Sequence, residues 1–247
     1  MSEGFIGIGT VINVIAIILG AFIGRVSGSR LSEKSRTLMT DVLGAVTLIG
    51  AASALISFWD KDFISAVPKG APIIIILLSL LIGGLIGSVI GLEDRLESWG
   101  ERLKARFSRD SESRFVEGFV TASLIFVIGP LAILGSISDG MQAGIDQLIL
   151  KSILDFFAAI AFAAAMGWGV ALSALPVGIY QGLWTLVGIG LGNVLADYQV
   201  AAMTATGGVL LFGIAMKLLS IKKIEIGNLL PALALAPLLA LLAQNLR

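Results

Sequence analysis

Long apolar segments alternate with short charged ones along the whole chain. Eight segments are long enough to cross a bilayer as helices of about 20 residues. They are Phe5–Val26, Val42–Phe58, Ala71–Leu92, Phe115–Ile137, Leu148–Val170, Leu172–Leu195, Val200–Leu219 and Ile226–Leu246. The pattern predicts an all-α, polytopic transmembrane helix bundle with about eight spans, formed by a single integral membrane domain over residues 1–247. Between Lys151 and Asp197 the only charge is Asp155, so the fifth and sixth spans are hard to separate and one of them could be re-entrant.

The fourth segment is interrupted near its middle by Gly129-Pro130. Proline lacks the backbone N–H and clashes with the carbonyl four residues earlier, here that of Phe126. A carbonyl freed inside hydrocarbon costs several kcal/mol unless protein or water satisfies it. Two interpretations follow: a proline kink whose carbonyl is satisfied by a neighbouring helix, or a discontinuous helix of the kind that marks transporter binding sites.

Composition supports the membrane assignment and excludes several kinds of chemistry. The chain is 57% hydrophobic and 14% charged, against about 25% charged residues in soluble domains. The formal net charge is zero, which argues against nucleic acid as a partner. There is no cysteine or histidine, which excludes disulfides, thiol nucleophiles, the usual zinc and haem ligands, and Ser-His-Asp triads. We therefore expect neither an enzyme nor a cofactor, and leave any metal site open.

The distribution of lysine and arginine predicts the orientation in the membrane. All of them except Lys61, Lys69, Lys151 and Arg247 fall in the first, third and seventh connections between spans. The basic connections are expected on the cytoplasmic side, which places both termini outside. An even number of spans also requires the termini to share a side, so the two inferences agree.

A glycine-rich repeat occurs in the first and third spans. Residues 19–28, LGAFIGRVSG, and 82–91, IGGLIGSVIG, are identical at five of ten positions. Glycines spaced by four lie on one helix face, where they let the backbone of another helix approach closely. That helix can belong to the same chain or to another copy in a homo-oligomer. A charged segment and another span follow each copy, which gives repeat units at about 5–58 and 71–137. The second charged segment carries Leu92, Leu96, Trp99, Leu103 and Phe107 at helical spacing, which predicts an amphipathic surface helix.

Few polar residues lie inside the predicted spans, and such residues are often functional. Asp155 is either a local pair with Lys151 at the interface or a carboxylate that faces the bundle interior. Asn13 and Gln181 can hydrogen-bond between helices or contact a ligand. Ser136 and Asp139 follow the interrupted segment, although Asp139-Gly140 is also a common turn signal. Asn193 lies near the end of the sixth span. The candidate pathway residues are Asn13, Gly129, Pro130, Ser136, Asp139, Asp155 and Gln181.

Four stretches of the chain resemble the YqgA/YdfK-like family of bacterial multi-pass membrane proteins. They are GTVINVIAIILG at 9–20, VIGPLAILGSISDG at 127–140, KSILDFFAAIAF at 151–162 and LPVGIYQG at 175–182. The resemblance covers most of the chain and implies a bacterial plasma-membrane protein, without implying a substrate. Asn13, Asp139, Asp155 and Gln181 fall inside these stretches.

The leading hypothesis is a transporter or channel for a small solute or ion, with its site at the interrupted fourth span. In that hypothesis, backbone carbonyls near Gly129 offer oxygen ligands and Asp155 supplies a countercharge. The alternative is a homo-oligomeric scaffold or sensor that docks a cytoplasmic partner through its amphipathic helices. An integral-membrane enzyme has the least support, because no pair of carboxylates is visible inside the spans.

Overall fold

A computed structural model describes residues 5–107, 114–191 and 195–246. Every regular element within these ranges is a helix, as the sequence predicts. Seven helices are long and apolar enough to cross a membrane, and the bent pair α6–α7 brings the number to eight if it forms one span. The chain divides into two compact units, Met1–Leu43 with Glu97–Val194, and Gly44–Leu96 with Leu195–Arg247. The boundaries between the units fall inside α2 (Glu33–Leu55) and α5 (Leu92–Phe107).

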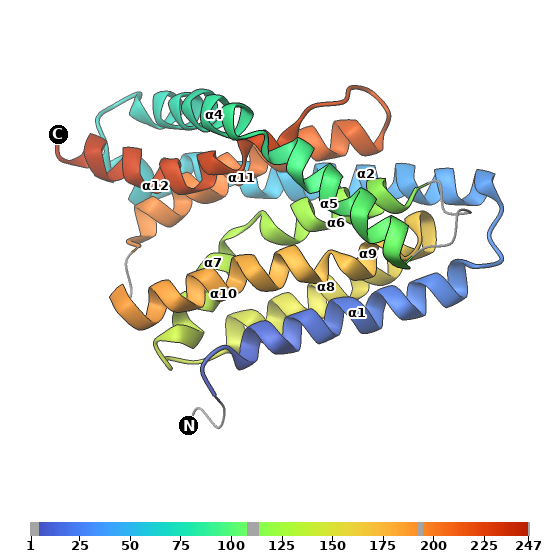
Figure 1. The fold of residues 1–247 in the computed structure, drawn as a ribbon. Coiled ribbons are helices and arrows are strands. Elements are labelled where there is room, and N and C mark those ends of the chain that lie inside the picture. The colour runs from blue at the N-terminus through green and yellow to red at the C-terminus, as the bar shows by residue number, and fades with distance from the viewer. Residues whose placement is uncertain (1–4, 108–113, 192–194, 247) are drawn as a thin grey trace. The chain divides into compact units, whose positions relative to one another are not determined.

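The first unit is built around α1 and α8, two long helices that lie side by side (Figure 1). Besides parts of α2 and α5, its helices are α1 (Ile8–Gly28), α6 (Phe115–Val127), α7 (Pro130–Gly140), α8 (Asp146–Met166), the short α9 (Gly169–Leu172) and α10 (Ala174–Leu191). Between α8 and α10 the chain turns at Gly167, whose φ of 87° suits glycine. The predicted fifth and sixth spans are therefore two separate segments, Asp146–Met166 and Gly169–Gly190, and each is long and apolar enough to cross a membrane.

The glycine row of the first span provides the contact between α1 and α8. Gly20, Gly24 and Gly28 are buried. A Cβ at these three positions would overlap backbone atoms of Phe156, Ile160 and Ala164, respectively. Because the residue numbers of the contacting positions increase together along α1 and α8, the two helices are parallel. At the end of the pair, the Arg36 guanidinium donates to the carbonyl oxygens of Gly28 (2.8 Å) and Ala164 (3.4 Å), where helix carbonyls lack intrahelical partners.

The α6–α7 pair runs from one end of this unit to the other. At the start of α6, a Cβ on Gly169 of α9 would overlap the backbone of Phe115. This places the start of α6 beside α9, which follows the C-terminal end of α8. At the end of α7, Asp139 accepts hydrogen bonds from the amides of Gly7 and Gly9 at the opposite end of α1. The two helices together therefore bridge the length of the unit, as a broken span does.

The second unit packs α4 and α11 against α12. Its elements, besides parts of α2 and α5, are the 3-10 helix η1 (Ile56–Trp59), α3 (Lys61–Ala66), α4 (Ala71–Ile90), α11 (Asp197–Leu218), the 3-10 helix η2 (Ile226–Leu229) and α12 (Pro231–Gln244). Its core is small-residue packing around Phe63, with Ala202, Ala236 and Ala240 fully buried. The second glycine row lies here, where Gly83 and Gly87 face backbone atoms of Ala232 and Asn228. Both glycine rows thus make close helix contacts within this chain.

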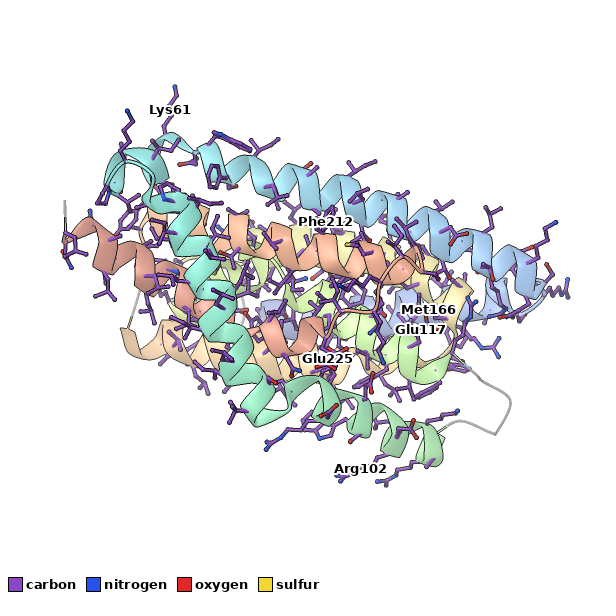
Figure 2. The ribbon with its side chains drawn as sticks, turned by 90° about the horizontal axis from the view of Figure 1, so that it is seen from above. Lys61, Arg102, Glu117, Met166, Phe212 and Glu225 are labelled. Atoms are coloured by element: carbon purple, nitrogen blue, oxygen red, sulfur yellow. The ribbon has the colours of Figure 1, made fainter. Side chains whose placement is uncertain are left out.

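The two charged segments that follow the glycine rows form different structures. The first continues without interruption into the second span, so that α2 is one helix from Glu33 to Leu55. The second is a separate helix, α5, in which Gly100 is buried against Phe119 and Trp99 is exposed. Figure 2 shows Arg102 on α5 and Lys61 on α3 with their side chains pointing outward, as solvated charges do. The side chain of Phe107 lies outside the described residues.

Candidate functional site at the break between α6 and α7

The interrupted span is a break in the helix rather than a kink within one helix. Residue Val127 ends α6, Ile128 is extended, and Pro130 begins α7, where its missing N–H is harmless. The two helix axes differ by 63°. Gly129 joins them with φ 136° and ψ 152°, a conformation that only glycine adopts readily. The sequence Gly-Pro therefore fits this break at both positions.

A cavity of about 170 Å³ lies at the break. Its walls come from the end of α6, the start of α7 and the middle of α8. The lining residues are Ile125, Ile128, Gly129, Pro130, Leu131, Ala132, Lys151, Leu154 and Asp155. Lys151 and Asp155 are the charged groups in this otherwise apolar lining. Three of the predicted pathway residues therefore line the same cavity, namely Gly129 and Pro130 of the fourth span and Asp155 of the fifth.

Asp155 holds together a buried polar cluster. Its Oδ2 accepts hydrogen bonds from Lys151 Nζ at 2.6 Å and from Asn13 Nδ2 at 3.0 Å. Lys151 and Asp155 are each 6% exposed, and Asn13 is fully buried. The Lys151 ammonium also lies 6.0 Å from the centre of the Phe126 ring, within range of a cation–π contact. The sequence allowed either a local pair between Asp155 and Lys151 or a carboxylate that faces the interior. The structure combines the two, because Asp155 is paired with Lys151 and is buried.

The charges of this cluster cancel. A lone carboxylate or ammonium inside the membrane costs several kcal/mol, and each member of the pair compensates the other. Both of these hydrogen bonds end on Oδ2 of Asp155 rather than on Oδ1. This leaves one carboxylate oxygen in the cavity lining, next to an ammonium, for interaction with a polar molecule. The arrangement offers both an anionic and a cationic group with no excess charge.

The remaining predicted residues lie elsewhere in the first unit. Gln181 is fully buried on α10, three residues after Gly178, which faces Val14 of α1. Asp139 caps the amino end of α1, with its oxygens 3.2 and 2.9 Å from the amide nitrogens of Gly7 and Gly9. Ser136 donates to the carbonyl of Ala132 in its own helix. Asn193 lies outside the described residues.

Besides Asp139 and Asp155, the structure buries a third carboxylate that sequence reasoning missed, Glu93 in the second unit. It is 2% exposed. Its oxygens accept from the amide of Gly227 (2.6 Å) and from Lys217 Nζ (3.3 Å), and its own amide donates to Asn228. All its partners fix the chain between α11 and α12 to the start of α5, so its role is structural. The sequence does contain one signal for its burial. Glu93 follows the second glycine row, and that row predicts close contact with a neighbouring backbone.

Replacing Gly129 by alanine tests the conformation at the break. A Cβ at Gly129 would meet no atom within 4 Å, so any loss of stability comes from the backbone conformation alone. We expect Gly129→Ala to lower the free energy of unfolding by about 1–3 kcal/mol. Gly190→Ala, in helical backbone with equal space around its Cβ, should change it little. Thermal unfolding in detergent compares the two variants, and equal melting temperatures would contradict the assigned strain.

Comparison with known proteins places the whole chain in one family. The model of the family described as "Protein of unknown function (DUF554)" matches residues 8–241. The uncharacterized membrane protein YdfK of Bacillus subtilis (strain 168) is 29% identical over 229 residues, which are 93% of each chain. The uncharacterized protein YqgA of Escherichia coli (strain K12) is 30% identical over 234 residues, 93% of this chain and 94% of that one. No solved structure matches significantly.

Proposed function

The chain belongs to the DUF554 family of multi-pass membrane proteins, and we propose that it moves a small solute or ion across the membrane through its first unit. The observation that carries this proposal is the break between α6 and α7, which adjoins a cavity holding the buried Lys151–Asp155 pair. Discontinuous helices near the membrane midplane commonly form the binding sites of transporters.

The position of the break supports transport. Irregular backbone at membrane depth is tolerated where it is buried in protein or lines a wet cavity. Because α6 starts at one end of the α1–α8 pair and α7 ends at the other, the break lies part-way along the unit. The cavity volume of about 170 Å³ is several times the volume needed to hold one water molecule, so the cavity can hold a small solute. A transported molecule would meet the ion pair at this point.

The charge distribution supports an orientation for this transport. We propose that the basic connections lie in the cytoplasm of a bacterial cell and that both termini lie outside the plasma membrane, following the rule that positive loops stay inside. In this orientation Asp139, at the amino end of α1, lies near the outer surface. The proposal involves no catalytic step.

Flux measurements in proteoliposomes test the proposal. The double variant Lys151→Met with Asp155→Leu removes both charges from the cavity and leaves none unpaired. We expect the wild-type protein to accelerate the entry of at least one solute from a panel of glycerol, urea, glycine and rubidium ions. We expect the double variant to lose at least about 90% of that flux, since losing two charge-assisted contacts of about 1.5–3 kcal/mol each reduces solute binding more than tenfold.

The matched control is Ser79→Ala in α4 of the second unit. Ser79 is fully buried, but its hydroxyl bonds to the Ile75 carbonyl of its own helix, so we expect wild-type flux. The proposal fails if wild-type vesicles match empty ones for every solute, or if the double variant, shown to be folded, transports as well as the wild type.

A scaffold or sensor is the second candidate, and the exposure of Trp99 on α5 favours it. Trp99 is 46% exposed on a helix rich in charged residues, as an anchor for a cytoplasmic partner would be. The glycine rows are occupied by helices of the same chain, so a homo-oligomer would have to use other faces. A soluble protein that co-purifies with the wild type, but not with Leu96→Asp/Trp99→Asp, would support this function, whereas equal recovery with both would contradict it.

A further inference from the structure

The contact between α1 and α10 buries polar groups that have no partner. Thr10 is 8% exposed, and Asn13 and Gln181 are fully buried. Thr10 Oγ1, Asn13 Oδ1, Gln181 Oε1 and Gln181 Nε2 form no hydrogen bond within the described residues. We call Thr10, Asn13 and Gln181 the amide cluster.

The amide cluster is continuous with the ion pair at the cavity. Thr10 and Asn13 are three residues apart and lie on one face of α1. Because α1 and α8 are parallel and the chain reverses before α10, α10 runs antiparallel to α1 (Figure 1). With Gly178 against Val14, one further turn of α10 brings Gln181 towards Thr10. Asn13 connects the two sets, because its Nδ2 donates to Asp155 while its Oδ1 stays unpaired.

Packing between helices does not account for the amide cluster. Polar side chains that join membrane helices do so by hydrogen-bonding to each other or to backbone carbonyls. Most buried hydroxyls among the described residues are paired, as Ser152 is by donating to the carbonyl of Leu148 in its own helix, and Thr121 on α6 is a further exception. Native proteins leave few buried polar groups unpaired, because each such group costs about as much as a lost hydrogen bond. Four unpaired atoms on facing helices therefore indicate a polar molecule that binds there.

The types of unpaired atom define the class of that molecule. A bare cation would satisfy the three oxygens but would leave the N–H groups of Gln181 unpaired. An anion would accept from those N–H groups and from the Thr10 hydroxyl but would leave the two amide oxygens unpaired. A molecule with both donors and acceptors can satisfy all of them. The neighbouring Lys151–Asp155 pair has no net charge and also offers one group of each sign. A solute without net charge fits this surrounding better than an ion, because an ion would leave one excess charge in the membrane.

We propose that the transported molecule is a small, net-neutral solute carrying both hydrogen-bond donors and acceptors, and that the amide cluster binds it next to the ion pair. This inference rests on the transport function proposed above and names its substrate class. The solute passes between the cavity at Gly129 and the α1–α10 contact, which Asn13 connects through its hydrogen bond to Asp155 of the cavity lining. Neutral polar molecules and zwitterions belong to this class, and inorganic ions do not.

The experiment compares solute classes and a glutamine variant in proteoliposomes. Entry of glycerol, urea and glycine is followed by osmotic swelling, and entry of rubidium and chloride by radioactive tracers. We expect the wild type to accelerate at least one of the three net-neutral solutes and neither ion. We expect Gln181→Leu to lower that solute flux by about tenfold, as the loss of one hydrogen bond to the solute would.

A second glutamine provides the structural control. Gln199 on α11 is also buried, but its amide bonds to the carbonyl of Pro237 and the amide of Ala196. Gln199→Leu should lower the melting temperature and leave flux per folded protein unchanged. Gln181→Leu should leave the melting temperature unchanged or raise it, because the folded protein loses no hydrogen bond.

The outcomes separate the two proposals. If the wild type moves none of the five probes, the transport function itself is wrong. If it moves rubidium or chloride but no net-neutral solute, transport stands and the substrate class is wrong. An unchanged neutral flux in Gln181→Leu, or a melting temperature that falls as in Gln199→Leu, would show that the amide cluster serves only the fold.

Discussion

Replacing Asp155 by asparagine is expected to destabilise the protein by about 3–5 kcal/mol, because it leaves the Lys151 ammonium buried without its counter-ion. Lys151 is 6% exposed and bonded at 2.6 Å to the carboxylate that this substitution removes. The neighbouring Asn13 would then face an amide in place of the carboxylate oxygen to which it now donates. Equilibrium unfolding in mixed detergent micelles measures the difference.

The double variant Lys151→Met with Asp155→Leu should be destabilised less than Asp155→Asn, because it leaves no buried charge without its counter-ion. Replacing both partners of a buried pair by apolar residues of similar volume is often neutral or even stabilising. In this variant the buried Asn13 Nδ2 loses its acceptor, which costs about 1–3 kcal/mol, so we expect the loss of stability to stay within that range, although transport is lost. If Asp155→Asn and the double variant were equally stable, the pair would not be buried as described. A double variant that unfolds would show instead that the pair is required for folding.

Replacing Gly24 by leucine is expected to cost at least about 3 kcal/mol, the upper end of the range for overpacked sites. A Cβ at Gly24 would overlap the backbone carbonyl of Ile160, which cannot move aside as a flexible side chain can. The substitution therefore has to separate α1 from α8, and with it the Asn13–Asp155 hydrogen bond. Thermal unfolding in detergent measures the loss of stability.

Gly50→Leu is the matched control for this prediction. Gly50 lies in a helix of similar length, α2, and a Cβ there would meet no atom within 4 Å. Its replacement should leave the melting temperature unchanged or raise it, since leucine favours the helix more than glycine does. Equal loss at both positions would indicate a general intolerance of bulk rather than the close contact between α1 and α8.

The helical class, the membrane assignment and the family were predicted from the sequence and are confirmed. They depend on local signals, namely apolar runs of spanning length and motifs that extend over most of the chain. The interruption at Gly129-Pro130 was also predicted, although the sequence left open whether it is a kink or a break. It is a break, in which the glycine adopts the positive φ and the proline takes the first position of α7. Short-range physics determines these features, so a single sequence contains them.

The composition of the site could not be predicted, because it depends on contacts between distant residues. Nothing near Asn13 in the sequence indicates that its amide meets Asp155. Asp139 has the sequence of an ordinary turn residue, yet it holds the amino end of α1. The glycine rows predicted close packing but not which helix packs there. The i, i+4 spacing of Lys151 and Asp155 predicted their pairing, whereas their depth in the unit is known only from the structure.

The pairing of α1 with α8 has a consequence for biogenesis. Asn13 and its partner Asp155 are 142 residues apart in the chain. During synthesis, the first helix enters the bilayer before its partner exists. Its glycine face stays uncovered while the ribosome adds more than half of the protein. A nascent chain released before the fifth span is made therefore exposes the glycine face of α1. Any other helix with small residues on one face can pack there. Ribosome-bound chains of increasing length should acquire protease resistance in this region only after α8 has left the translocon.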